Sequence, residues 1–303
     1  MAAKKQVIID TDLRIDDAQA IMMALAAPNI EIVGVTCVFG NAAIEHVCQN
    51  VLRVLAVCER EGIPVFRGSG VPLVGARNPV SDHFGTDGLG DVLKDKDPQW
   101  EEKIQSEHAV NALIRLVTAN RKQVSLVALG PLTNLALAVR LDPRKGNVTL
   151  CAEFNFAMDP ESAYIVLEEF LCPTYLATWE YSCRNALTWV RCDAPAAAFM
   201  TVITSKCRAY CRETTSNKRY VYFGSGYVSD DAYAMGRLHR RQCGDGEHRV
   251  SGPRGAAGLH VSRHDGSGSN QRAEEEPQRV RAHQCDVEKF SQLLLQSLRQ
   301  PKK

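Results

Sequence analysis

Short apolar, β-branched runs alternate with amphipathic stretches along the first two thirds of the chain. Strands are expected at 6–10, 30–38, 63–68, 124–130 and 174–181. Helices are expected at 16–28, 42–60, 108–120, 132–141 and 159–171. Repeated alternation of this kind is typical of parallel strands, because each must be joined to the next by a crossover connection. The sequence therefore predicts an α/β fold, with a mostly parallel central sheet covered by helices on both faces.

The same pattern indicates where a ligand would bind. In open parallel sheets, ligands bind at the carboxyl ends of the strands. The residues that follow Ile9, Val38 and Ala128 stand at such ends. We therefore expect the chemistry of the protein in these three segments.

The charge balance argues against two classes of partner. The 303 residues include 36 Lys and Arg against 35 Asp and Glu, a net charge of +1, which gives no electrostatic basis for binding nucleic acid or an acidic membrane. No apolar run approaches the roughly 20 residues of a membrane helix, and the N-terminus runs into strand-like sequence without a signal-peptide pattern. The 11 Cys residues lack zinc-site spacing, so we expect a cytoplasmic protein with reduced thiols.

Four aspartates fall within eight residues where the first strand ends and the first helix begins: Asp10, Asp12, Asp16 and Asp17. Asp16 or Asp17 can cap the helix, whose dipole favours anions there, and this accounts for one or two of the four. Four carboxylates in one turn repel each other unless a cation or a polyol compensates, and oxygen ligands at this density suit Ca²⁺ or Mg²⁺. A metal site is therefore favoured over a solvated acidic turn.

Six motifs follow one another along the chain: DTDLRIDDAQAIMMAL (10–25), VTCVFGN (35–41), DGLGDV (87–92), ALGPLTNLALAVRLDP (128–143), AEFNFAMDPESAYIV (152–166) and SDDAYAM (229–235). Together they resemble the inosine–uridine-preferring nucleoside hydrolases over residues 5–235 and the last helix. The first and fourth motifs are the specific ones. The resemblance implies a nucleoside hydrolase-like, Rossmann-like architecture and Ca²⁺-dependent hydrolysis of the N-glycosidic bond of purine or pyrimidine ribonucleosides.

The resemblance also implies roles for individual residues. Asp12 would be both a Ca²⁺ ligand and the general base for the attacking water, and Asp17 would bind Ca²⁺ through both oxygens. The other metal ligands would be the backbone carbonyl of Thr133 and the carboxylate of Asp231. Ribose hydroxyls would be held by Asp16, Asn41, Asn147, Glu153 and Asn155. Asp10 would support the site without touching the substrate.

This set of residues suits the reaction. Breaking an N-glycosidic bond builds oxocarbenium charge on the ribose, as in the hydrolysis of O-glycosides. A carboxylate beside a water can take its proton, and a cation that holds the water lowers its pKa. The partners implied are a small-molecule ribonucleoside and further copies of the chain in a homodimer or homotetramer, with no nucleic acid and no membrane.

Residues of the later motifs also have purely structural interpretations. Gly40-Asn41 can be a simple turn, and Thr133 can be a helix cap. Glu153 and Asn155 lie two residues apart, so a strand would place them on one face, which favours a site.

Two functional alternatives remain open beside hydrolysis. The first is a catalytically impaired relative that binds metal or nucleoside without turnover. The second is a Mg²⁺-dependent phosphatase of the haloacid dehalogenase type, because residues 9–12 resemble its Asp-x-Asp nucleophile motif.

The chain departs from the family pattern inside its most acidic motif. Leu13-Arg14 replaces the family's Pro-Gly, so a bulky cation stands where glycine permits the close approach of a ligand. Two placements are open to Arg14: outward, or onto the acids, where it would compete with Ca²⁺. Phe84 stands where the family has His, and no acid for the leaving base is identified.

Two further departures concern length and composition. Residues 141–154 are too short for the strand that the family places there, so a strand near 144–147 is predicted to be missing. Residues 237–284 contain nine Arg, no Lys and no Phe, Trp or Tyr, without helical or strand periodicity. The codons for residues 260–266, read one base later, can encode a strand of the family. We therefore interpret residues 237–284 as a segment translated out of frame. The predicted organisation is an α/β domain at 1–236, this irregular basic segment, and a helix of the same domain at 285–303.

Overall fold

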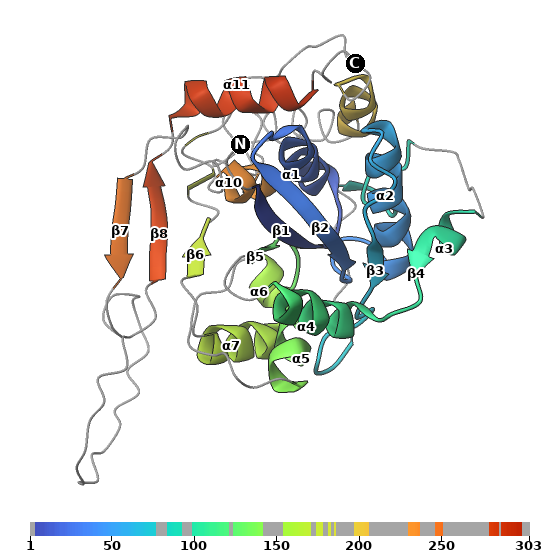
Figure 1. Cartoon of the computed structure of the whole chain (residues 1–303), viewed down its shortest axis with the longest axis vertical. Helices are drawn as coiled ribbons and strands as arrows, with labels where there is room; N and C mark the ends of the chain where they lie inside the picture. The colour runs from blue at the N-terminus through green and yellow to red at the C-terminus, as the bar shows by residue number, and fades with distance from the viewer. Residues whose placement is uncertain are drawn as a thin grey trace, which may run out of the picture.

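The fold is known from a computed structural model. It describes residues 4–76, 84–92, 99–120, 124–141, 154–170, 174–177, 181–182, 185, 197–205, 230–236, 246–250, 279–284 and 286–298. Figure 1 shows a central sheet with helices packed around it. Among the described helices, none has the length and apolar character needed to cross a membrane.

The centre of the fold is a five-stranded sheet with the order β4-β3-β2-β1-β5. Its strands are β1 (Lys5–Thr11), β2 (Ile30–Cys37), β3 (Val65–Arg67), β4 (Ile104–Gln105) and β5 (Val124–Ala128). All four neighbouring pairs are parallel. The predicted parallel sheet is therefore confirmed, and β1 ends between β2 and β5.

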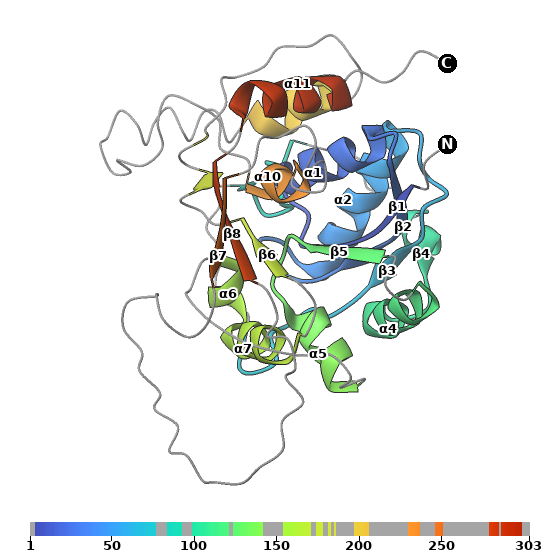
Figure 2. The same cartoon turned by 60° about the vertical axis from the view of Figure 1, so that its left-hand side comes forward.

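Helices cover both faces of this sheet (Figure 2). One face carries α1 (Ile15–Ala26), α2 (Ile44–Val57), α10 (Asp230–Gly236) and α11 (Val287–Leu298). The other face carries α4 (Ala109–Ala119), α5 (Thr133–Leu141) and α7 (Pro160–Glu169). Two short helices, α3 (Trp100–Lys103) and α6 (Phe154–Met158), lie in the connections.

Side chains of β1 alternate between these two helical layers. Val7 and Ile9 belong to the core cluster that contains α1 and α2, whereas Ile8 belongs to the cluster that contains α4 and α5. A strand directs successive side chains to opposite faces, so a strand buried on both faces must be apolar throughout. This requirement explains the continuous run Val7–Ile9, which delivers the aspartates that follow it to the end of the sheet.

Three strands form a second sheet with the order β6-β8-β7. β6 (Thr174–Leu176) pairs in parallel with β8 (Arg279–Gln284), and β7 (Gly246–Val250) pairs with β8 antiparallel. β7 and β8 both lie in 237–284, so the expectation of no regular structure is wrong for these two strands. Strands pair through hydrogen bonds between backbone N–H and C=O groups, so pairing does not require apolar and polar side chains to alternate in the sequence. The missing strand near 144–147 and the candidate strand at 260–266 lie outside the described residues.

The motif around Asn155 differs from its expected conformation. Phe154–Met158 form helix α6, so Asn155 lies on a helix. The expectation that it shares a strand face with Glu153 is therefore wrong for Asn155, and Glu153 lies outside the described residues. A short apolar run does not distinguish a buried helical turn from a strand, which is why the local pattern misled.

Candidate functional site

The four clustered aspartates lie at the C-terminal end of β1 and in the first turn of α1. Asp10, Asp12 and Asp17 are 0% exposed, and Asp16 is 4% exposed. A solvated acidic turn is therefore excluded. Buried carboxylates need hydrogen-bond donors or positive charge, and the neighbours of each one show what it can do.

Asp10 is held from two sides of the sheet. Its Oδ1 accepts hydrogen bonds from Thr36 Oγ1 at 2.6 Å and Asn134 Nδ2 at 2.9 Å. Burial raises the pKa of Asp10 to about 7, although both hydrogen bonds lower it. Both hydrogen-bond donors to Asp10 come from inside the protein, and its supporting role stays a prediction.

Asp12 is oriented by the turn that follows β2. Its Oδ2 accepts from the backbone N–H of Asn41 at 2.9 Å and from Asn41 Nδ2 at 3.0 Å. Its Oδ1 is buried and has no hydrogen-bond partner among the described residues. A Cβ on Gly40 would lie 2.0 Å from Asp12 Oδ2, so this approach is possible only for glycine. Gly40-Asn41 is therefore more than a simple turn, because it fixes the carboxylate that the sequence predicted as the general base.

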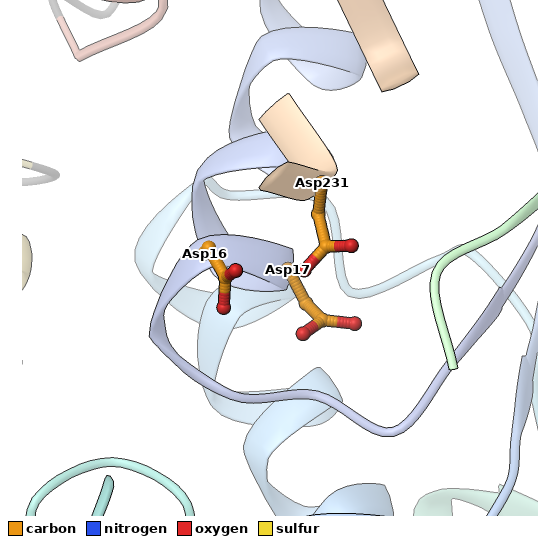
Figure 3. Close-up of side chains that lie close together, drawn as sticks. All are labelled: Asp16, Asp17 and Asp231. Atoms are coloured by element: carbon orange, nitrogen blue, oxygen red, sulfur yellow. The ribbon is translucent and has the colours of Figure 1, made fainter. Parts of the chain in front are cut away.

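Three carboxylates converge beside Asp12. Asp16 and Asp17 of α1 and Asp231 of α10 have oxygen atoms within 4.8 Å of one another (Figure 3). Asp17 Oδ1 accepts from the hydroxyl of Thr11, and Asp17 Oδ2 accepts from the backbone N–H of Arg14 at 3.1 Å. The structure thus brings the distant Asp231 beside the N-terminal acids, and its role as a metal ligand stays a prediction. Asp12 is not one of these three carboxylates, and its role as a metal ligand stays a prediction.

Arg14 lies inside the acidic cluster. Its Nε is 3.4 Å from Asp16 Oδ1 and 3.5 Å from Asp17 Oδ2, and its Nη2 is 3.7 Å from Asp231 Oδ2. Its guanidinium also lies over the rings of Phe84 and Phe154, at 5.5 and 5.6 Å from their centroids. Arg14 is 7% exposed. Of the two placements that the sequence left open, the structure has the inward one.

The charges of this cluster are not balanced by Arg14 alone. Burial raises the pKa of Asp17 to about 8, and repulsion by Asp12 adds to this, while Arg14 lowers it. Burial also raises the pKa of Asp12. Burial works to lower the pKa of Arg14, but Asp16 and then Asp231 raise it well above its usual range. The guanidinium therefore keeps its single positive charge among these carboxylates.

The remaining predicted residues are only partly placed. Thr133 is the first residue of α5, and its hydroxyl donates to Asp159; the role of its carbonyl as a metal ligand stays a prediction. Asn155 Nδ2 donates to the carbonyl of Leu129 at 2.8 Å, and Asn155 Oδ1 is buried without a hydrogen-bond partner among the described residues. Asn147 lies outside the described residues, as does Glu153.

Two buried polar residues that support the site were not predicted. Asn134 donates to Asp10 and also to the carbonyl of Cys37 at 2.8 Å, and it accepts from the N–H of Ser69 at 2.9 Å. It thereby joins β1, β2 and the loop after β3. The sequence predicted a role for its neighbour Thr133 and none for Asn134.

Asp159 is the second of these residues. It caps α7 through the N–H of Ser162 at 3.0 Å and accepts from the N–H of Leu73 at 2.9 Å. The Asp-Pro pair that opens this helix was a usable signal for the cap, because proline favours the first helical position. Its contact with Leu73 depends on a distant loop and had no local signal.

Comparison with known families decides the classification. The model of the inosine-uridine preferring nucleoside hydrolase family matches residues 7–145 and 144–292. The chain belongs to this family. The two matches meet at 144–145, within the stretch where a family strand is predicted to be missing. Membership in this nucleoside hydrolase family overturns the phosphatase alternative, whose nucleophile Asp10 is fully buried and doubly hydrogen-bonded.

Individual relatives agree with this classification. A probable uridine nucleosidase of Oryza sativa subsp. japonica and the inosine-uridine preferring nucleoside hydrolase of Leishmania major are both 39% identical, over 184 and 183 residues. These matches cover 54% of this chain and 55% and 57% of the two relatives. The chain thus aligns with little more than half the length of the curated relatives it matches.

Solved structures resemble the whole chain. An inosine-guanosine nucleoside hydrolase has a TM-score of 0.75 at 26% identity, with 98% of this chain and 99% of that chain covered. The purine-preferring ribonucleoside hydrolase from Gardnerella vaginalis has a TM-score of 0.76 at 23% identity, with 97% and 98% covered. The second likeness concerns the fold alone.

Proposed function

We propose that the chain hydrolyses the N-glycosidic bond of ribonucleosides to give ribose and a free base. The observation that carries this proposal is the position of Asp12. It is a buried carboxylate at the end of a central parallel strand, with one oxygen fixed and the other without a hydrogen-bond partner among the described residues. Family membership supports the substrate class, and the relatives' names point to inosine, guanosine and uridine.

Asp12 is arranged to take a proton from water. Asn41 holds Oδ2 through two hydrogen bonds, so Oδ1 keeps a fixed direction. A water at Oδ1 would lose its proton to Asp12 as its oxygen attacks the anomeric carbon of the ribose. Burial raises the pKa of Asp12, which makes the ionised carboxylate a stronger base than one in water.

The surrounding oxygens suit the sugar. Cleavage builds positive charge on the ribose, and the carboxylate of Asp16 would stabilise that charge while it holds a hydroxyl. Asn155 Oδ1, which is buried without a hydrogen-bond partner, would accept from a second hydroxyl. Asn41, Asn147 and Glu153 remain proposed ribose ligands from the resemblance, although the amide of Asn41 is bonded to Asp12.

Ca²⁺ is the ion that such hard oxygen ligands would suit, and it would hold the ribose diol and the attacking water. Asp16, Asp17 and Asp231 have the donor chemistry and the proximity to ligate it. However, the guanidinium of Arg14 already lies within 3.4–3.7 Å of all three carboxylates. A divalent ion therefore does not fit this arrangement unless Arg14 leaves, and no step of the proposed reaction is assigned to a metal.

The test is release of ribose from inosine and from uridine, each measured with and without a Ca²⁺ chelator. We expect Asp12→Asn to lower turnover by at least about a hundredfold, the range in which general-base catalysis operates. Asp286→Asn, at the exposed start of α11, is the matched control and should keep wild-type turnover. Equal turnover by both variants, or no ribose release by the wild-type chain, would contradict the proposal.

A second candidate is a nucleoside-binding protein without turnover. The inward Arg14 favours it, because a guanidinium polarises a water less than a divalent ion does. Calorimetry that detects inosine binding in the absence of base release would support this candidate. A cytoplasmic location and a homodimer or homotetramer stay predictions from the sequence.

A further inference from the structure

The guanidinium of Arg14 has the surroundings of a bound cation. Its Nε faces Asp16 and Asp17, and its Nη2 faces Asp231, at 3.4, 3.5 and 3.7 Å. These are the three carboxylates whose oxygens approach within 4.8 Å of one another. Such a group is stable in a buried place only if positive charge lies among its members. In this protein the charge comes from the chain itself.

The distances indicate that charge, more than hydrogen bonding, holds Arg14 in place. Arg14 Nε is buried and makes no hydrogen bond among the described residues, although two carboxylates lie near it. Phe84 and Phe154 present their rings to the guanidinium at 5.5 and 5.6 Å. A flat guanidinium gains from aromatic faces, because the ring quadrupole attracts its charge.

We propose that Arg14 is the resident cation of this acidic pocket and excludes divalent ions from it. Its guanidinium lies among the carboxylates of Asp16, Asp17 and Asp231 that would otherwise ligate such an ion. Any ligand binding in this pocket is consequently independent of added metal. The statement on ligand binding rests on the proposed function, whereas the exclusion of metal does not.

The competing arrangement is an Arg14 that moves outward when a divalent ion arrives. This movement would take a 7% exposed guanidinium out of the cluster and away from both aromatic rings. It would also separate the guanidinium from the carboxylates of Asp16, Asp17 and Asp231, which are its ionic partners in the pocket. Both costs oppose the exchange in the wild-type chain, and removal of Arg14 eliminates them.

The experiment is isothermal titration of chelator-treated protein with CaCl₂. The wild-type chain should show no saturable binding, and Arg14→Gly and Arg14→Gln should each gain one site. Adding Asp231→Asn to Arg14→Gly should abolish the gained site. Arg53→Gln, which changes another buried arginine (8% exposed) that is bonded to Asn50, should gain none.

For variants that fold too poorly for titration, the melting temperature measured with and without CaCl₂ tests the same proposal. Removing Arg14 leaves buried carboxylates uncompensated, so both Arg14 variants should melt lower than the wild type and recover when Ca²⁺ is added. Equal Ca²⁺ affinity of the wild type and Arg14→Gly would overturn the proposal. Folded Arg14 variants that gain no site, or variants that Ca²⁺ does not rescue, would overturn it too.

Ligand binding is tested separately. Calorimetric binding of inosine to the wild-type chain should be unchanged by the chelator, and a chelator-sensitive affinity would contradict metal independence. Neither titration depends on turnover. A chain that releases no ribose therefore refutes the proposed function and leaves the assignment of Arg14 to be judged by the metal titration.

Discussion

Asn41 donates two hydrogen bonds to one oxygen of Asp12, from its backbone at 2.9 Å and from its side chain at 3.0 Å. The double contact sets the plane of the carboxylate and leaves the opposite oxygen available. β1 supplies Asp12 and the turn after β2 supplies Asn41, so the pair depends on the parallel pairing of these two strands. The geometry of the proposed base is thus a product of the sheet.

Asn41→Ala should impair the reaction more than the fold. One of the two donors to Asp12 Oδ2 is lost while the backbone donor remains, so we expect about 1–2 kcal/mol less stability and about tenfold slower turnover. Ribose release and thermal unfolding measure the two effects. Asn120→Ala removes a side-chain hydrogen bond at the end of α4 and should leave turnover unchanged. A variant as active as this control would show that Asn41 does not orient Asp12.

Gly40→Ala should damage the site through a single methyl group. The new Cβ would lie 2.0 Å from Asp12 Oδ2, so either the turn or the carboxylate must move. Forced movement in a close-packed interior costs about 1–3 kcal/mol. Gly62→Ala is the matched control, because a Cβ there meets no atom within 4 Å. We expect a lower melting temperature and little ribose release for the first variant only; indistinguishable variants would contradict the observed approach.

Asn134→Ala should destabilise the whole end of the sheet. The side chain is 0% exposed and joins Asp10, the carbonyl of Cys37 and the N–H of Ser69. Its removal leaves buried groups without partners, each at a cost of about 1–3 kcal/mol. Denaturant unfolding should show a loss of at least about 2 kcal/mol. A loss no larger than that of Asn120→Ala would mean that Asn134 is not the link between these strands.

The helix caps Asp159 and Asp286 should differ in how much they contribute to the free energy of unfolding. Asp159 caps α7 and also binds Leu73 and Thr133. Among the described residues, the side chain of Asp286 binds Lys289 in the first turn of α11. Loss of a cap costs about 1 kcal/mol, and the buried partners of Asp159 add to that cost. Asp159→Ala should therefore lower the free energy of unfolding by about 2–4 kcal/mol, and Asp286→Ala by about 1 kcal/mol. Equal losses would refute the tertiary role of Asp159.

Prediction from sequence succeeded where the determining pattern is local. The apolar run of β1 and the 3.6-residue spacing of α1 are set by neighbours in the chain, and both elements lie within a few residues of their expected bounds. Prediction failed at α6, where a short apolar run fits both the 3.6-residue period of a helix and the two-residue period of a strand. It also failed at β7 and β8, which are held by backbone pairing with each other and carry no periodic side-chain signal.

The sequence by itself determined the parallel sheet and the delivery of four aspartates to the end of β1 and the start of α1. Only the tertiary structure decided the direction of Arg14. Its side chain can reach solvent or the acids from the same backbone position, and local propensity does not distinguish these rotamers. The inward rotamer is stabilised by Asp231, Phe84 and Phe154. These residues come from separate parts of the chain, and folding alone brings them around one guanidinium.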